Sequence, residues 1–198
     1  EYGGLHYGVV LDMKNDRNSP VVTVIPLTSL KEGADIHKNS VDLGNDIYRM
    51  LKLKYDTISK TLKDEHNEIE QTLSLTSDLF SSANQAINEI LHFEEASPEY
   101  KSKLVQIGDY LASARDVRIS LAAKREHNLE QQEYLDKIGT EIQKMKEGSV
   151  ALVNQITTIS KIRIFDPRNL KGILSGISLS EENMEKINRK VQELYVFH

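Results

Sequence analysis

The residues best suited to chemistry form a basic cluster near the C-terminal end of the chain. Four basic residues fall within eleven positions, with Asp166 as the only acidic residue among them: Lys161, Arg163, Arg168 and Lys171. Lys and Arg side chains bind phosphate groups, and on nucleic acids they do so by displacing condensed counterions. The cluster is therefore a candidate phosphate-binding site.

Histidine is the other residue type here that could carry chemistry, because its imidazole titrates near neutral pH. The six His residues show no metal-ligand spacing and form no His-Glu-x-x-His motif: His6, His37, His66, His92, His127 and His198. The chain also has no Cys, no P-loop and no Gly-x-Gly-x-x-Gly sequence. Disulfides and Cys-ligated metals are thus excluded, no motif indicates nucleotide binding, and we expect no metal and no cofactor.

The composition is that of a globular protein. The chain has 198 residues, with 25 Lys and Arg against 30 Asp and Glu, so its formal net charge is -5. Hydrophobic residues make up 39% and charged residues 28%, and the length suits one domain or one domain with a large insertion. No apolar stretch is long enough to cross a membrane and no signal peptide is visible, so we expect a soluble, cytoplasmic protein without membrane contacts.

The elements that must position the basic cluster follow from a change of pattern along the chain. Residues 1–43 contain two apolar, β-branched runs separated by a polar turn cluster, which predicts a β-hairpin. Residues 44–147 contain apolar residues at spacings of three and four, which predicts two long amphipathic helices. Ser97 followed by Pro98 predicts the start of the second helix.

The two predicted helices match each other as an antiparallel coiled coil. With the turn centred near residue 97, the numbers of facing residues should sum to 193 or 194. This register aligns seven apolar pairs: Ile90–Leu104, Ile87–Ile107, Phe80–Ala114, Leu73–Leu121, Ile58–Leu135, Tyr55–Ile138 and Leu51–Ile142. Glu65 and His66 fall opposite Asn128 in the middle of the seam, and we expect this polar layer to fix the register at a cost in stability.

After the helices, the pattern returns to β structure. Residues 149–159 and residues 162–165 each predict a strand, and residues 170–174 predict a turn of helix or a bend. Ser180 followed by two Glu residues predicts the N-cap of a final helix.

The domain organisation follows from these segments. We expect a small β-rich core formed by residues 1–43 and 148–198, interrupted by a helical hairpin arm formed by residues 44–147. The arm contains 14 basic and 19 acidic residues and so carries the whole charge deficit of the chain. An acidic arm is poorly suited to clamping nucleic acid.

The β-rich segments, taken in order, carry a resemblance to one family. Residues 3–11, Gly-Gly-Leu-His-Tyr-Gly-Val-Val-Leu, resemble a Gly-Gly-x-Arg-Pro-x-x-Val opening, and residues 22–29, Val-Thr-Val-Ile-Pro-Leu-Thr-Ser, resemble a central strand ending in Thr. Residues 149–161 are similar to a strand containing Gln-Ile-Arg-Thr-Ile-Asp-Lys, and the helix after Ser180 matches the family's ending. This family is the PemK/MazF group of bacterial toxins, and the arm has no counterpart in it.

The resemblance implies an α+β fold, with an SH3-like β-barrel of the PemK/MazF type, a long antiparallel coiled-coil hairpin inserted into it, and a C-terminal helix. The family's first strand precedes the Gly-Gly turn, so we expect a strand upstream of Glu1. The family also implies a homodimer, a cognate antitoxin protein, and metal-independent cleavage of single-stranded RNA. In that reaction the ribose 2′-hydroxyl attacks the neighbouring phosphate, and the site must supply a base, an acid and groups that stabilise the phosphate charge.

The same resemblance selects the candidate site residues. His6 stands where the family has Arg and can act as base or acid, although a lone His in an apolar run can also be a packed strand residue. Thr28 matches a Thr whose hydroxyl donates to phosphate, and Arg163 is the candidate cation; these three are the catalytic candidates. The substrate-binding candidates are Ser29, Gln155, Thr157 and Lys161.

Two alignments of the last family strand are open. In the straight alignment, Thr157 and Ser160 stand where relatives have Arg and Asp, so the charged pair is absent. In an alternative alignment shifted along the chain, Arg163 and Asp166 occupy those two places.

Two functions of different class follow. The first is a toxin-like endoribonuclease that cleaves single-stranded RNA. The alternative is a catalytically silent interaction protein, in which the coiled-coil arm binds a partner protein. Because the helix pair is far longer than a barrel loop requires, we also expect the outer face and tip of the arm to mediate recognition or dimerisation. A gyrase-directed toxin, acting through DNA, is a third and minor option. The tip residues in question are Glu94, Glu95, Ser97 and Glu99.

Overall fold

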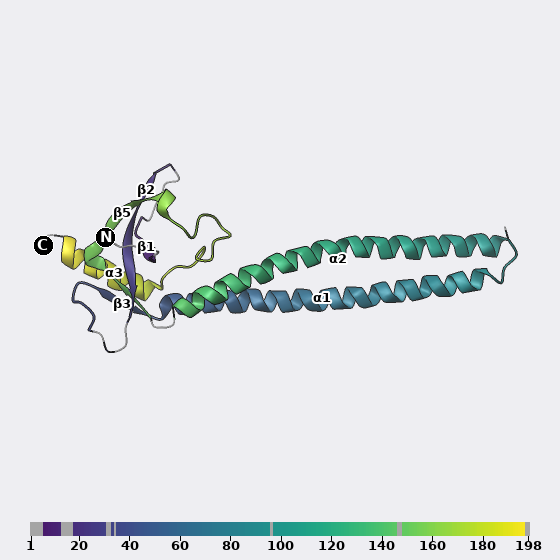
Figure 1. Cartoon of the computed structure of the whole chain (residues 1–198), viewed down its shortest axis with the longest axis horizontal. Coiled ribbons are helices and arrows are strands. Elements are labelled where there is room, and N and C mark those ends of the chain that lie inside the picture. Colours follow the sequence, from purple (N-terminus) through teal and green to yellow (C-terminus); the bar gives the residue numbers. More distant parts are fainter. Residues whose placement is uncertain are drawn as a thin grey trace. The chain divides into compact units, whose positions relative to one another are not determined.

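The chain is represented by a computed structural model that describes residues 6–12, 18–30, 33, 35–95, 97–145 and 148–196. It divides into two compact units, drawn in Figure 1. The core unit comprises Glu1–Asp56 and Asp136–His198, and the hairpin unit comprises Thr57–Leu135. The Gly3-Gly4 pair of the family-like opening lies outside the described residues, as do residues 15–17 of the predicted turn cluster.

The core unit is built on a small antiparallel sheet (Figure 1). Its strands are β1 (Gly8–Val10), β2 (Val21–Ser29), β3 (Val41–Gly44), β4 (Ser149–Ala151) and β5 (Thr157–Ser160). β2 is central: β1 pairs with one of its edges, β4 and β5 pair with the other, and β3 continues the sheet beyond β4. The described strands form an open sheet rather than a closed barrel, and with the helices they make an α+β fold.

β2 changes the face that it turns toward the core. Val22 and Val24 are buried in its first half, and Ile25 and Leu27 are buried in its second half, so the two-residue alternation shifts by one at Ile25. Alternate residues of a regular strand point to opposite faces, and a shift of this kind therefore means that the strand turns about its axis. Pro26 follows directly, and its carbonyl still accepts a hydrogen bond from the Leu152 N–H at 3.0 Å.

The predicted strand over residues 149–159 is interrupted. Ala151 of β4 pairs with Leu27, and Thr157 of β5 pairs with Val24. Two residues of β2 therefore lie opposite five residues of the segment between β4 and β5. The three extra residues of that segment are taken up by the short 3-10 helix η1 (Val153–Gln155). This is an enlarged bulge, and it gives the buried Val153 a place in the core.

The predicted strand over residues 162–165 is wrong. The chain there forms a second 3-10 helix, η2 (Lys161–Arg163), followed by irregular structure. The ladder between β2 and β5 ends with the pair Val21–Ser160, and the Lys161 N–H then bonds to the Pro20 carbonyl at 2.9 Å. Because β2 begins at Val21, the following residues have no further length of β2 to pair with. Residues 170–174 form turns, as predicted.

Three helices complete the fold: α1 (Asp46–Ile90), α2 (Pro98–Lys144) and α3 (Glu181–Tyr195). The predicted N-caps of α2 and α3 are confirmed. The Ser97 hydroxyl accepts from the Tyr100 N–H at 3.0 Å, and the Ser180 hydroxyl accepts from the Asn183 N–H at 3.4 Å. None of the described helices has the length of apolar sequence that crossing a bilayer requires.

The first turns of α1 and the last turns of α2 belong to the core unit. Ile47 and Leu51 of α1 and Ile138 and Ile142 of α2 are buried together with the sheet residues of that unit. The boundary between the units therefore falls inside the helices rather than at residues 44 and 147. Apolar side chains in the first turns of α1 and the last turns of α2 fill the core, because one face of a small sheet must be covered by other elements.

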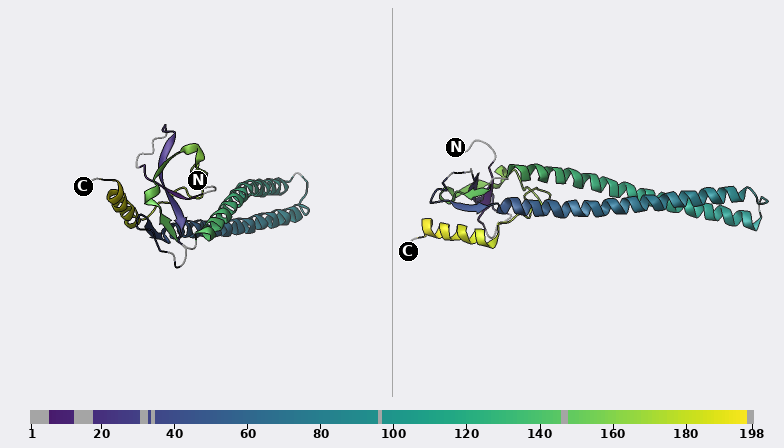
Figure 2. Two further views of the ribbon diagram at one scale, coloured as in Figure 1. Left: turned by 60° about the vertical axis from the view of Figure 1, so that its left-hand side comes forward. Right: turned by 90° about the horizontal axis from the view of Figure 1, so that it is seen from below.

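In the hairpin unit, α1 and α2 lie side by side and cross each other gently (Figure 2). The Asn128 amide donates to the Glu65 carboxylate at 3.4 Å, and Lys124 and Glu68 form an ion pair at 3.0 Å. Both contacts join residues whose numbers sum to 192 or 193, so the predicted antiparallel register and its polar layer are confirmed.

The residues that fill the seam differ from those predicted. Leu73, Phe80, Ile87 and Leu104 are between 42% and 50% exposed, although the sequence predicted all four as seam residues. Small buried residues, Ala83 and Ala86 among them, take the seam positions instead. On α1, seam positions recur every seven residues and include Leu62, Ile69 and Ile90. The exposed Leu73, Phe80 and Ile87 each follow a seam position by four residues. The apolar stripe is wider than one seam, and periodicity alone does not reveal which part of it is buried.

Candidate functional site

The candidate site begins with the pairing of β1 and β2, which brings the N-terminal segment alongside the central strand. Val9 pairs with Ile25, and the register continues beyond the strand at both ends. The Leu27 N–H donates to the Tyr7 carbonyl at 2.9 Å, and the Leu11 N–H donates to the Thr23 carbonyl at 3.0 Å. Facing residues therefore have numbers that sum to 34 from Tyr7 to Leu11.

Continued by one residue beyond the Tyr7–Leu27 hydrogen bond, this register would set His6 opposite Thr28, although β1 itself begins at Gly8. Tyr7–Leu27 and Val9–Ile25 are hydrogen-bonded pairs of the antiparallel ladder. Because such pairs alternate with non-hydrogen-bonded pairs, a His6–Thr28 pair would be non-hydrogen-bonded. In such pairs the Cα atoms lie about 4.5 Å apart and the side chains share one face of the sheet. Both side chains are exposed. Two of the three catalytic candidates thus belong to segments that pair with each other, next to the last observed pair, Tyr7–Leu27.

Two further hydroxyl groups lie at the same end of β2. Ser29 follows Thr28 and is exposed, and Ser149 of β4 pairs directly with Ser29. The sequence analysis named Ser29 but missed Ser149, because only the register of β2 and β4 reveals that pairing. On the other face of β1, the Tyr7 hydroxyl donates to the Glu141 carboxylate of α2, which ties β1 to the last turns of that helix.

Gln155 of η1 and Thr157 of β5 lie opposite the middle of β2. Thr157 is exposed and pairs with Val24, four residues from Thr28, which corresponds to about 13 Å along an extended strand. Gln155 is half-buried and closes η1, where its N–H donates to the Leu152 carbonyl at 2.9 Å. Through this hydrogen bond, Gln155 stabilises the bulge between β4 and β5.

Lys161 and Arg163 lie at the other end of β2. The backbone of Lys161 bonds to Pro20, eight residues from Thr28, and this separation corresponds to about 26 Å along an extended strand. The structure therefore does not bring Arg163 to His6 and Thr28. The seven predicted site residues are thus spread along β2: His6, Thr28 and Ser29 at one end, Gln155 and Thr157 opposite the middle, and Lys161 and Arg163 at the basic end.

The basic end carries an exposed aromatic ring that the sequence analysis missed. Phe165 is 67% exposed, and the Arg168 guanidinium lies 5.9 Å from the centre of its ring. The Arg168 Nε–H also donates to the Ile164 carbonyl at 3.0 Å, and this hydrogen bond fixes the guanidinium against the backbone four residues earlier. An aromatic residue inside the run of basic residues was visible in the sequence and is the signal that could have identified it.

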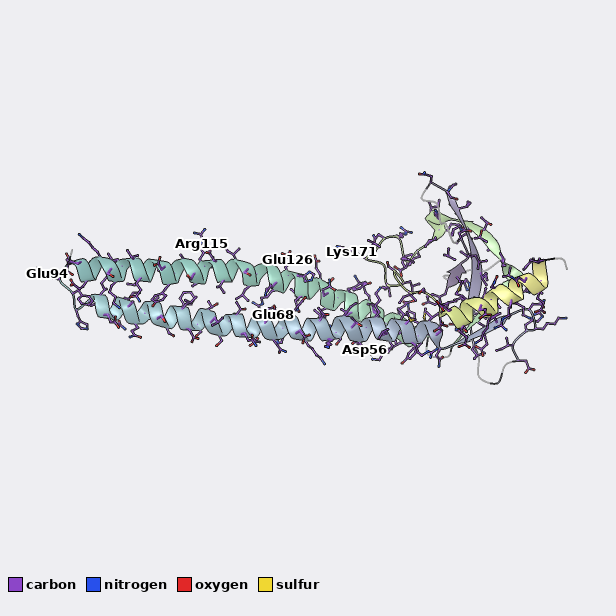
Figure 3. The ribbon with its side chains drawn as sticks, turned by 180° about the vertical axis from the view of Figure 1, so that it is seen from behind. Asp56, Glu68, Glu94, Arg115, Glu126 and Lys171 are labelled. Carbon is purple, nitrogen blue, oxygen red and sulfur yellow. The ribbon has the colours of Figure 1, made fainter. Side chains whose placement is uncertain are left out.

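The loop that carries Lys171 is held in place by Asp166 and Lys54 (Figure 3 labels Lys171). The two Asp166 carboxylate oxygens accept from the N–H groups of residues 173 and 174 at 2.9 and 2.7 Å. Lys54 donates to the Ile173 carbonyl at 2.9 Å. At Gly172, a Cβ atom would lie only 2.5 Å from an Asp166 oxygen, so the loop requires glycine there. Asp166 thus serves to fold the loop.

The described residues contain no cluster of three or more His, Asp or Glu side chains that could hold a metal ion. Comparisons of the chain with family models, with curated proteins and with solved structures find no match. An assignment of function therefore has to be argued from the geometry of the core unit and from the resemblance of its segments.

The His6–Thr28 end has the groups for acid–base chemistry on a phosphate ester. An imidazole can exchange a proton near neutral pH, and neighbouring hydroxyl groups can donate hydrogen bonds to phosphate oxygens. The basic end offers positive charge and one aromatic face, which are the two features that bind single-stranded nucleic acid. Chemistry and electrostatic binding thus occupy different ends of β2.

Proposed function

We propose that the core unit is an endoribonuclease of the PemK/MazF type that cleaves single-stranded RNA without a metal ion. The observation that carries the proposal is the β1–β2 register, observed from Leu11 to Tyr7, whose continuation by one residue would set His6 beside Thr28. The proposal includes an SH3-like barrel, a homodimer, a cytoplasmic location and a cognate antitoxin. The small antiparallel sheet around β2 supports the barrel, the homodimer and the antitoxin rest on the resemblance alone, and the cytoplasmic location rests on the sequence pattern.

His6 is the proposed general base. It takes the proton of the ribose 2′-hydroxyl, the 2′-oxygen attacks the adjacent phosphorus, and the bond to the 5′-oxygen breaks as that oxygen receives a proton from water. The products are a 2′,3′-cyclic phosphate and a 5′-hydroxyl. Thr28 donates a hydrogen bond to a phosphate oxygen, whose charge rises as the attack proceeds, whereas Ser29, the next residue of β2, offers its hydroxyl to the RNA on the other face.

The basic end is proposed to hold the RNA strand away from the point of cleavage. Lys161 and Arg163 neutralise backbone phosphates, and a base stacks on the exposed ring of Phe165. The RNA then follows β2 from the basic end to His6. This arrangement replaces the earlier expectation that Arg163 stabilises the reacting phosphate, because its position along β2 is too far from Thr28.

The test is cleavage of a fluorescent single-stranded RNA in EDTA. We expect His6→Ala and Thr28→Val to lower the cleavage rate by about 100-fold or more, because each removes a group that acts on the reacting phosphate. Thr28→Ser keeps the hydroxyl and should retain most of the activity. Intact RNA with the unmodified protein, or equal rates for the Val and Ser variants, would contradict the proposal.

Binding separates the two ends of β2. Arg163→Ala should weaken RNA binding and lower the slope of log affinity against log salt by about 0.7, the value for one lost phosphate contact on a single strand. His6→Ala should leave that slope unchanged. Measurement of affinity by fluorescence anisotropy at several salt concentrations distinguishes the two variants, and an unchanged slope for Arg163→Ala would remove the basic end from the proposed RNA path.

The second candidate function is a catalytically silent interaction protein whose helical hairpin binds a partner protein. The division of the catalytic candidates between two ends of β2 favours it, because a reaction site needs its groups together. Under this alternative, the RNA stays intact with every variant. Loss of the cellular effect after substitutions in the hairpin alone would then support it.

A further inference from the structure

The hairpin unit has one apolar side that its own two helices do not cover. Leu73, Phe80 and Ile87 stand seven residues apart on α1, and Leu104 and Leu111 stand seven apart on α2; we call these five the apolar strip. Each side chain is between 42% and 50% exposed. Residues seven apart form a row along one side of a helix, and the row on α1 is about 21 Å long.

The two rows lie on the same side of the seam. Every strip residue follows a seam position by four, and in an antiparallel pair such positions on both helices flank the same side. A cavity of about 410 Å³ nearer the core unit confirms this geometry, because its lining includes Ser59 and His66 of α1 and Gln132 of α2. These three residues continue the two rows of the strip in steps of seven.

The opposite side of the seam is more polar, although it includes the exposed Leu75, seven residues before Ser82. A smaller cavity there, of about 120 Å³, is lined by residues that include Ser82, Glu89, Lys103 and Gln106. Glu89 and Lys103 form an ion pair across the two helices, and the hydrogen bond from Lys103 holds the pKa of Glu89 below its ordinary value. The apolar residues of the hairpin are thus unevenly distributed around the seam, as in a helix pair that forms part of a larger bundle.

The surroundings of the strip carry few charges on α1, where Glu70, three residues before Leu73, is a carboxylate that borders it. Ser77 and Asn84 border it on α1, whereas Lys101, Gly108 and Arg115 border it on α2, where Arg115 points away from α1 (Figure 3). Charged residues are depleted at the centres of protein interfaces. Apart from Glu70, the described residues that border the strip carry no carboxylate, so this is a side on which two acidic hairpins can meet with little repulsion.

Gly108 marks a place where another backbone can approach closely. It lies between Leu104 and Leu111 in the middle of α2, where glycine costs roughly 1 kcal/mol relative to alanine. A Cβ atom at this position would meet no other atom of the described chain within 4 Å. The hairpin itself therefore gives no packing reason for glycine, whereas a helix laid along the strip does.

We propose that the apolar strip is the contact between two copies of this chain, whose hairpins pack strip to strip as a four-helix bundle. The five side chains leave roughly 450 Å² of apolar surface exposed, taking about 200 Å² for each when fully exposed. Two copies together bury about 900 Å² of it, which is the apolar share of a standard interface of about 1,600 Å². In the two-fold arrangement, the strip residues of α1 in one copy lie over those of α2 in the other copy. The residues that border the strip on α2 include the basic Lys101 and Arg115.

The experiment measures the distance between hairpins in the full chain. The chain has no Cys, so Ser81→Cys provides a single site for a spin label, on an exposed position next to Phe80 in the sequence. The bundle predicts a distance between the labels of two copies within about 40 Å, given helix spacings of 8–10 Å and the length of the labels. Mass by light scattering is recorded in parallel.

Matched variants make the result specific to the strip. Phe80→Glu combined with Leu111→Glu should weaken the contact by at least about 100-fold and abolish the distance signal, because it buries charge at the interface. Gly108→Gln should weaken it while preserving the helix. Leu75→Glu, at a side chain 62% exposed and outside the strip, is the control and should leave the signal intact. Circular dichroism verifies that each variant keeps its helix content.

Three outcomes would overturn the proposal. A chain that stays monomeric at several hundred micromolar leaves the strip to a different occupant, such as an acidic amphipathic helix of another protein. A dimer without the distance signal associates through the core unit instead. A signal that survives the double Glu variant places the contact on another side of the hairpin. None of these results depends on whether the protein cleaves RNA.

Discussion

At the residue scale, Asp46 joins three elements of the core unit. It lies in the first turn of α1 and is buried, and its carboxylate accepts from the Ser180 N–H at 2.8 Å and the Asn183 amide at 3.0 Å. The same Asn183 amide donates to the Leu43 carbonyl at 3.1 Å at the end of β3. Burial alone would raise the pKa of Asp46, but these hydrogen bonds and the nearby Arg49 outweigh it and hold the pKa below its ordinary value.

Asp46→Asn is expected to lower the free energy of unfolding by about 1–3 kcal/mol at pH 7, since it removes the charge that these donors stabilise. The folded pKa lies below the unfolded value of 3.8, so the stabilisation is present above that value and disappears as the pH falls through the folded one. The two proteins should therefore converge in stability at strongly acidic pH. Urea unfolding from pH 7 to pH 2 measures this, with Asp109→Asn as an exposed control; a constant difference would contradict the assignment.

At the element scale, the hairpin shows how a helix pair selects its seam. Leu62 and Ile69 of α1 and Leu121 and Leu135 of α2 are buried, and the polar layer of Glu65 and Asn128 lies among them. Toward the tip, small residues such as Ala83, Ala86 and Ala114 fill the seam, so the helices approach closely there. The stability of the hairpin therefore depends on a few large buried residues near its middle.

Leu121→Ala should destabilise the hairpin unit by about 2–4 kcal/mol, because it leaves a cavity in a seam with few large side chains. Leu121 is 6% exposed, whereas Leu129, eight residues further along the same helix, is 68% exposed. Leu129→Ala is therefore the matched control and should change the stability by less than about 0.5 kcal/mol. Thermal unfolding followed by circular dichroism compares the two; equal losses would show that the seam is placed incorrectly.

At the scale of the whole molecule, the hairpin unit is inserted into the core unit, which is formed by the chain before and after it. The core unit takes its buried residues from both sides of this excursion: Ile25 of β2, Leu51 of α1, Ile138 of α2 and Ile187 of α3 are all almost completely buried. The hairpin unit contributes no residue to that set. Each unit thus has its own apolar core, as a domain and an inserted domain do.

Replacing Thr57–Leu135 by a short Gly-Ser turn between Asp56 and Asp136 should leave the core unit folded, because every residue of its core remains. The expected result is a dispersed amide spectrum in which the resonances of β2, β4 and α3 keep their positions. Two-dimensional NMR of the shortened and the full chain makes the comparison. A collapsed spectrum would mean that the core unit depends on the hairpin for its stability.

The sequence by itself determined the elements whose causes are local. Ser97 and Ser180 begin α2 and α3 as side-chain caps, and the register of the hairpin follows from the turn near residue 97, in agreement with the contact between Glu65 and Asn128. Each depends on spacing along one or two helices, which the order of residues expresses directly.

Only the tertiary structure decided how residues far apart in the chain meet. The bulge at η1, the end of the ladder at Pro20, and the separation of Arg163 from Thr28 all depend on where β2 begins and how β4 and β5 share one of its edges. The burial of Ala86 in place of Ile87 depends likewise on the path of a second helix. Pairing and packing are set by competition among all the apolar surfaces of the chain at once, and no local pattern encodes the outcome of that competition.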